Sequence, residues 1–207
     1  MWLRRRAKAA PAPAEPPPAE VRPSGHGIEA ASPWVLRFAA GVPPGATVLD
    51  IACGRGRHAR LFADQGCIVD AVDVDAEAGA TLAEVAGVRF LRADLEGGNW
   101  PYPGRRFDVV VVTNYLHRPL FPRLAEALAP GGMLIYETFT IGNERFGKPK
   151  NPDFLLRPRE LVEAFAPGLA VLAFEEGVVS LPRPARVSRL CAVRAVGDAH
   201  LRLDADR

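Results

Sequence analysis

The sequence is poor in cysteine and has no long uninterrupted run of apolar residues. Its three cysteines are widely spaced and form no CxxC pair, which argues against a zinc site or a disulfide framework. No stretch reaches the roughly 18 consecutive apolar residues that a membrane-spanning helix requires. We therefore expect a soluble, cytoplasmic protein with reduced thiols, no bound metal and no membrane contact.

The chain also has little net charge, with 26 basic and 24 acidic residues and a formal charge of +2. The excess comes largely from Arg4, Arg5 and Arg6, so charge gives little support for a nucleic-acid partner. An Ala/Pro/Glu segment follows these arginines where a signal peptide would have its apolar region. A secretory signal is therefore not expected.

Length and composition predict one domain with two tails. With 207 residues, 48% of them hydrophobic, the chain can build one sizeable core but hardly two. Residues 7–24 are dominated by alanine and proline, which predicts a disordered tail over residues 1–25. We expect the domain at residues 26–196 and a flexible tail at residues 197–207.

Strand and helix patterns alternate through the middle of the chain. Apolar runs predict strands at residues 47–51, 68–73, 88–91, 107–113 and 133–137. Helical spacing predicts helices at residues 28–39, 58–65, 76–85, 120–128 and 159–165. Residues 170–174 and 188–193 predict two strands with no helix between them, as in an antiparallel edge hairpin. The pattern indicates an α/β fold whose mostly parallel sheet has helices on both faces.

A glycine-rich turn between the first strand and the next helix is the most informative motif. Gly54 and Gly56 let the backbone turn tightly and approach a ligand at the carboxyl edge of the sheet. Asp73 ends the second strand, where an acidic side chain can accept both hydroxyls of a ribose. Asp94 follows the third strand. These residues predict a site for a nucleoside-containing cofactor.

The spacing of Gly54, Gly56 and Ala59 also fits a dinucleotide fingerprint. Asp50 disfavours a dinucleotide, because a carboxylate beside the turn repels a pyrophosphate and suits an ammonium group. We also expect no second domain of the kind that holds a dehydrogenase substrate. An NAD(P)-binding oxidoreductase remains the alternative enzyme, and a cofactor-binding but inactive partner subunit is the alternative outside the enzymes.

Together the motifs resemble those of the class I S-adenosylmethionine-dependent methyltransferases over residues 34–193. The resemblance implies a Rossmann-like, doubly wound, three-layer α/β/α fold, with seven strands and the last one inserted antiparallel. It also implies S-adenosylmethionine as cofactor, with residues 50–56 at its methionine end, Asp73 at the ribose and Asp94 at the adenine. The implied cofactor-binding residues are Asp50, Ala52, Cys53, Gly54, Gly56, Asp73, Val74, Asp94, Leu95, Asn114 and Leu116.

Methyl transfer from a sulfonium is an in-line displacement, so alignment of the acceptor supplies much of the acceleration. We expect Tyr115, His117 and Glu137 to be catalytic, with Tyr115 positioning the acceptor and His117 removing a proton. His117 can equally cap the helix that follows. Cys53 and His58 are expected to be packing residues rather than a nucleophile and a base.

The long connection after the fifth predicted strand mixes aromatic and charged residues, which predicts a lid over the acceptor. Glu137, Arg145 and Phe146 are its candidate residues, and a plain crossover is the alternative. Residues 114–117 lack the Asn/Asp-Pro-Pro-aromatic element of base-amino methyltransferases, and no cysteine follows a proline. Nucleobases are therefore disfavoured, and we expect a small-molecule acceptor whose identity, like the oligomeric state, stays open.

Overall fold

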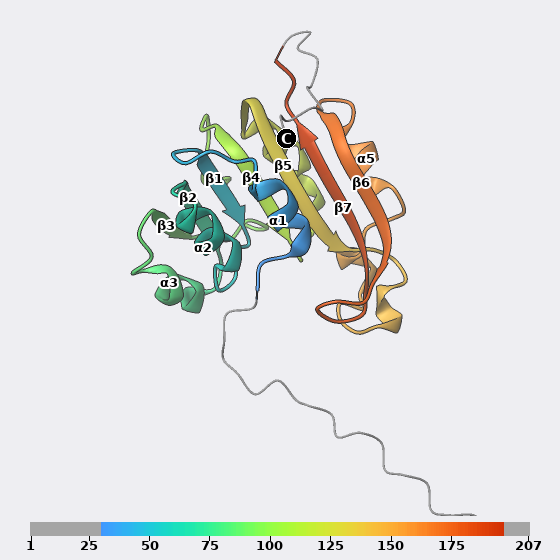
Figure 1. Ribbon diagram of the computed structural model, residues 1–207. Helices are drawn as coiled ribbons and strands as arrows, with labels where there is room; N and C mark the ends of the chain where they lie inside the picture. Colours follow the sequence, from blue (N-terminus) through green and yellow to red (C-terminus); the bar gives the residue numbers. More distant parts are fainter. Residues whose placement is uncertain (1–29, 197–207) are drawn as a thin grey trace, which may run out of the picture.

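The computed structural model describes residues 30–196, which form a seven-stranded sheet in the order β3-β2-β1-β4-β5-β7-β6 (Figure 1). β1 to β5 run parallel, and β7 lies antiparallel between β5 and β6. The strands are β1 Thr47–Ile51, β2 Ile68–Asp73, β3 Val88–Arg92, β4 Phe107–Thr113, β5 Leu128–Phe139, β6 Ala170–Val179 and β7 Ala185–Val193. The predicted fold class is confirmed.

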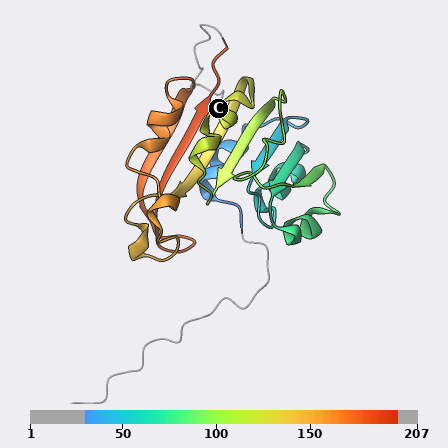
Figure 2. The same ribbon diagram turned by 180° about the vertical axis from the view of Figure 1, so that it is seen from behind.

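Helices cover both faces of this sheet and complete three layers (Figures 1 and 2). One face carries α1 Pro33–Ala39, α2 Arg57–Asp64 and α3 Ala76–Leu82, and the other carries α4 Phe121–Glu126 and α5 Glu160–Phe165. Three short 3₁₀ turns lie in the connections, η1 Arg118–Leu120, η2 Asn143–Arg145 and η3 Pro152–Phe154. No helix of residues 30–196 is long and apolar enough to cross a bilayer.

The valine run of β4 explains the two cores. Successive side chains of a strand point to opposite faces, and this central strand is buried on both. Val109 and Val111 pack in the cluster with α1, α2 and α3, whereas Val110 and Val112 pack with α4 and α5. A run without polar alternation is therefore what a central parallel strand requires.

Several predicted boundaries were wrong. α1 begins at Pro33, because Ser32 caps it and accepts a hydrogen bond from the Trp34 N–H, whereas Ile28 lies outside the described residues. α4 ends at Glu126, because Leu128 already pairs with Phe107 at the start of β5. The hairpin strands are longer than predicted, and both predicted tails lie outside residues 30–196.

Arg118 fastens the long connection after β5 to the body of the domain. Its guanidinium donates to both carboxylate oxygens of Glu160, at 2.6 and 3.0 Å, and to the carbonyls of Asp153 and Leu155, both at 2.9 Å. Burial alone would raise the pKa of Glu160, but the hydrogen bonds from Arg118 and Arg157 outweigh it and hold that pKa below its usual range. The connection is therefore anchored at its α5 end.

We expect Arg118→Met to lower the free energy of unfolding by about 2 kcal/mol at neutral pH, because it leaves the carboxylate of Glu160 without its main partner. The pKa of Glu160 is lower in the folded protein than in the unfolded chain, where it is about 4.3. Its charge therefore stabilises the fold above about pH 4.3, and this stabilisation is lost as the pH falls. The difference from wild type should therefore shrink below about pH 4. Urea denaturation measures it, and adding Glu160→Met should recover part of the loss; no recovery would count against the pair.

Candidate functional site

The glycine-rich turn between β1 and α2 is held in left-handed backbone conformations. Ala52, Gly54 and Gly56 have φ angles of 51°, 53° and 78°. A Cβ on Gly54 would meet open space, so the backbone there is accessible to a ligand. A Cβ on Gly56 would overlap the Leu82 side chain. The backbone at Gly54 is thus uncovered, whereas Gly56 is required by the packing of α3.

Asp50 lies beneath this turn rather than on its ligand-facing side. It is 1% exposed and accepts a hydrogen bond from the Ala59 N–H in the first turn of α2, while its Oδ2 has no hydrogen-bond partner within the described chain. Burial raises the pKa of Asp50 to about 7. The sequence did not predict that this carboxyl would be covered.

Asp73 is positioned by the turn that it faces. Its Oδ2 accepts from the Gly54 N–H at 2.8 Å and its Oδ1 from the Asp75 N–H at 2.9 Å. The side chain remains partly exposed, so each oxygen retains a lone pair for a further donor. Val74, the next residue, is 60% exposed and offers an apolar surface beside the carboxylate.

Asp94 stands in a similar turn after β3. Its Oδ1 accepts from the Glu96 and Gly97 N–H groups at 2.8 and 3.1 Å, which lowers the pKa of Asp94. The side chain is exposed, whereas Leu95 beside it is buried in the core. The carboxyl ends of β1, β2 and β3 therefore bring the predicted cofactor residues to one edge of the sheet, as the motif order implied.

The tip of β4 lies between Tyr115 and His117 on one side and Glu137 on the other, although all three were predicted to be catalytic. Asn114 is exposed, has a φ of 56° and donates its N–H to the Glu137 carbonyl at 2.9 Å, while Leu116 is buried in the core. Burial raises the pKa of Tyr115, and the charges of Glu96 and Asp94 add to this effect. Tyr115 therefore lies toward β3.

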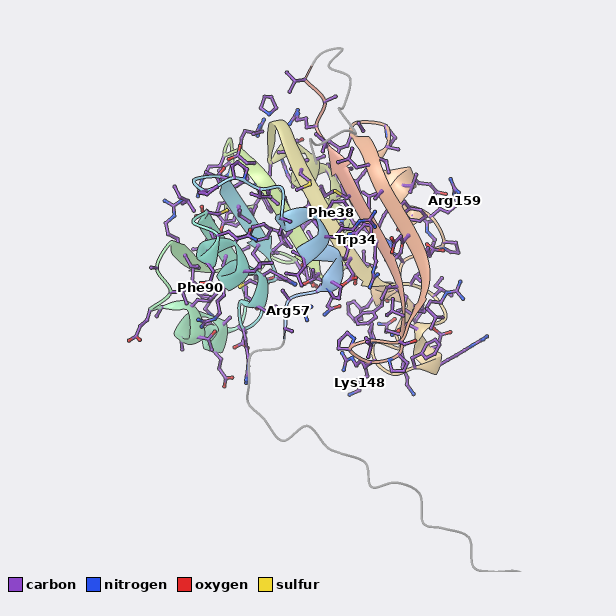
Figure 3. The ribbon with its side chains drawn as sticks, viewed as in Figure 1. Trp34, Phe38, Arg57, Phe90, Lys148 and Arg159 are labelled. Carbon is purple, nitrogen blue, oxygen red and sulfur yellow. The ribbon has the colours of Figure 1, made fainter. Side chains whose placement is uncertain are left out.

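His117 also lies on the β3 side, because its charge contributes to the lowered pKa of Asp94. A cavity of about 610 Å³ opens beyond Asn114 instead, and of the three predicted catalytic residues only Glu137 lines it. The cavity walls come from the segment before α1, the start of α2, the ends of β4 and β5, and the β6–β7 hairpin. Figure 3 labels Arg57 at the start of α2, one of the lining residues.

Glu137 is held from two sides within the cavity wall. It is 7% exposed, and its Oε1 accepts from the Ser32 hydroxyl at 2.8 Å. Its Oε2 is 2.5 Å from the Arg189 Nε, in an ion pair between residues that face each other across β5 and β7. Glu137 is thus paired with a hydroxyl from the segment before α1 and with a guanidinium from β7, which fixes its place in the cavity wall.

His58 joins the same network without acting as a base. Its Nε2 accepts from the Ser32 N–H at 3.1 Å, so we assign the ring proton to Nδ1, which lies 3.3 Å from the Thr113 hydroxyl. Burial lowers the pKa of His58 to about 3. The ring is therefore neutral at physiological pH and packs inside the protein, as expected.

Only one of the three predicted lid residues lies at the cavity. Glu137 lines the cavity, whereas Arg145 and Phe146 are exposed and are not among its lining residues. Sequence reasoning missed Ser32, Arg183 and Arg189, which belong to no motif, and it assigned no role to Arg57, which directly follows the glycine-rich turn. Only the facing charges of Glu137 and Arg189 could have been found, and they required the register of two strands distant in sequence.

We expect Asp50→Asn to remove a pH dependence of stability. A folded-state pKa of about 7 lies above the unfolded value of about 3.9, so the stability it confers is present below about pH 4 and is lost as the pH rises through 7. Ionisation therefore destabilises wild type, by up to about 4 kcal/mol, but not the variant. Urea denaturation without cofactor should show the variant gaining on wild type between about pH 5 and pH 8. Parallel pH profiles would refute the assignment.

Comparison with known proteins finds similarity over part of the chain. Residues 48–132 match the model of a methyltransferase domain. A protein-L-isoaspartate O-methyltransferase from Gloeobacter violaceus is 35% identical over 122 residues, which cover 55% of this chain and 58% of that relative. The chain thus matches little more than half of the curated relative's length.

Solved structures show the same fold. TehB from Haemophilus influenzae superposes with a TM-score of 0.65 at 19% identity, over 77% of this chain and 61% of that one. The N-methyltransferase NodS from Bradyrhizobium japonicum gives a TM-score of 0.62 at 15% identity, over 78% and 93% of the two chains. These likenesses concern the fold and leave the acceptor open.

Proposed function

We propose that this chain, which has the fold and the methyltransferase domain of the class I S-adenosylmethionine-dependent methyltransferases, methylates a small molecule bound in the 610 Å³ cavity. One observation carries the proposal. The cavity reaches both Arg57, next to the glycine-rich turn, and Asn114, at the tip of β4. An acceptor in the cavity would therefore adjoin the edge of the sheet where the cofactor residues gather.

The turn fits S-adenosylmethionine on features of this structure. The open space over Gly54 admits a ligand, and Asp73 has oxygen lone pairs for ribose hydroxyls beside the exposed Val74. The Oδ2 of Asp50 has no partner below the turn, and an ammonium group above the turn would favour the ionised form of this carboxyl. Arg57 would hold the carboxylate of the methionine end.

When bound, the cofactor supplies a methyl group attached to a positively charged sulfur and open to in-line displacement. The protein's part is alignment, since the cavity walls orient the acceptor and exclude water. Glu137 holds α1, β5 and β7 together around the acceptor rather than serving as the base. Tyr115 and His117 do not line the cavity and interact electrostatically with Asp94, so we assign them to the cofactor side.

The comparisons do not name the acceptor. The curated relative is named for an O-acceptor, protein L-isoaspartate, and NodS is named for N-methylation. The shared fold therefore carries different acceptors, and this chain matches only part of the first of these relatives. A cavity of about 610 Å³ is within the range of small-molecule sites, which supports a small acceptor. The comparisons do not favour the oxidoreductase alternative.

Titration calorimetry of the full chain tests the cofactor site. We expect S-adenosylmethionine and S-adenosylhomocysteine to bind with micromolar affinity and NADH not to bind. Asp73→Ala should weaken binding at least about tenfold, because it removes the ribose acceptor and the Gly54 N–H partner. Asp64→Ala, which removes an exposed carboxylate at the end of α2, should leave affinity unchanged. Tighter binding of NADH, or equal loss in both variants, would reject the proposal.

A further inference from the structure

We infer that the acceptor is a small organic anion, held by Arg183 at the tip of the β6–β7 hairpin while its apolar body lies along the cavity wall. This inference rests on the proposed function and adds the chemical class of its acceptor. It follows from the charges that line the cavity, from the partners of each charge and from the apolar surface between them.

The lining of the cavity carries more positive than negative charge. Its charged residues are Arg57, Arg183, Arg189 and Glu137, three guanidiniums against one carboxylate. Glu137 is already paired with Arg189 at 2.5 Å, and Glu175 lies 3.5 Å from the same guanidinium. Among the described lining residues, an acceptor amine would therefore find no carboxylate without a partner and would approach the guanidinium of Arg183.

The remaining cations stand at different parts of the cavity. Arg57 comes from the start of α2, directly after the glycine-rich turn, where it serves the cofactor's carboxylate under the proposed function. Arg183 comes from the loop between β6 and β7. Arg183 is exposed and has no hydrogen-bond or ion-pair partner among residues 30–196. It is therefore available to an anionic ligand.

The backbone restricts the position of this guanidinium. Arg183 lies between Pro182 and Pro184, whose rings fix their own φ angles and disfavour helical backbone in the preceding residues. β6 ends and β7 begins on either side of the same short loop. The loop therefore presents Arg183 from the edge of the sheet where β5 ends, since β5 and β7 pair up to Phe139 and Val187.

An apolar surface separates Arg183 from the tip of β4. Phe139, Val179 and Val187 pack together in one cluster and also line the cavity, and Leu181 continues this surface with 77% exposure. Burying such surface favours a ligand with a hydrophobic body. A bare inorganic oxyanion would satisfy Arg183 but leave this wall uncovered, and a neutral molecule would leave Arg183 without a counter-charge. An amphiphilic organic anion supplies a counter-charge for Arg183 and covers the apolar wall.

Matched fluorescent probes test the inference on the full chain saturated with S-adenosylhomocysteine. Dansylglycine carries a carboxylate, dansylglycinamide is its neutral counterpart, and dansylcadaverine carries an amine. We expect dansylglycine to bind about tenfold more tightly than the amide, because it makes one additional ionic contact at a partly exposed site. The amine should bind most weakly. Arg183→Gln should bring the acid to the affinity of the amide without changing the affinity of the amide, and Arg183→Lys should retain part of the preference.

Arg106→Gln is the matched control. It removes the same charge from an exposed residue at the amino end of β4, on the opposite edge of the sheet, and should keep the preference for the acid. Equal binding of acid and amide, preference for the amine, equal loss in both glutamine variants, or no binding of the acid at millimolar concentration would each overturn the inference. Titration of S-adenosylhomocysteine alone shows separately whether the cofactor site has failed.

Discussion

The ion pair between Glu137 and Arg189 joins the parts of the molecule that enclose the cavity. It crosses from β5 to β7, and Ser32 extends it to the start of α1 through a hydrogen bond to the same carboxylate. Arg189 also lies over the Trp34 ring, with its guanidinium carbon 5.8 Å from the ring centroid. Removing Arg189 would leave the buried carboxylate of Glu137 without its counter-charge, which costs more than an exposed pair contributes. The shape of the acceptor site therefore depends on this contact.

A second constraint acts at the carboxyl ends of the parallel strands. Asp73 accepts hydrogen bonds from the Gly54 and Asp75 N–H groups, and Asp50 accepts one from α2. These carboxylates order the turn before any ligand binds, so less conformational freedom is lost on binding. The same arrangement buries an oxygen of Asp50 without a hydrogen-bond partner, which disfavours the charged form of this carboxyl.

The glycine-rich turn and the carboxylates at the strand ends could be placed from the sequence because their signals are local. The bounds of β1, β2 and β4 agree with the apolar runs, and Gly54, Asp73 and Asp94 follow strands that periodicity identifies. The acceptor side could not be predicted, because its residues meet only through long-range pairing. Arg189 reaches Glu137 by strand register, and Ser32 contacts it over 105 positions of sequence. Tyr115, His117 and Glu137 were all expected to be catalytic, but only Glu137 lines the cavity.

The antiparallel insertion of β7 places the loop between β6 and β7 in a part of the molecule that can change independently of the glycine-rich turn. Because β6 and β7 enter the sheet after β5, their connecting loop returns to the acceptor side without contributing to the turn around Gly54. Substitutions in residues 180–184 can therefore alter the wall of the cavity while the turn around Gly54 stays unchanged. The composition of the cavity wall and the conformation of the glycine-rich turn are in this way separable during evolution.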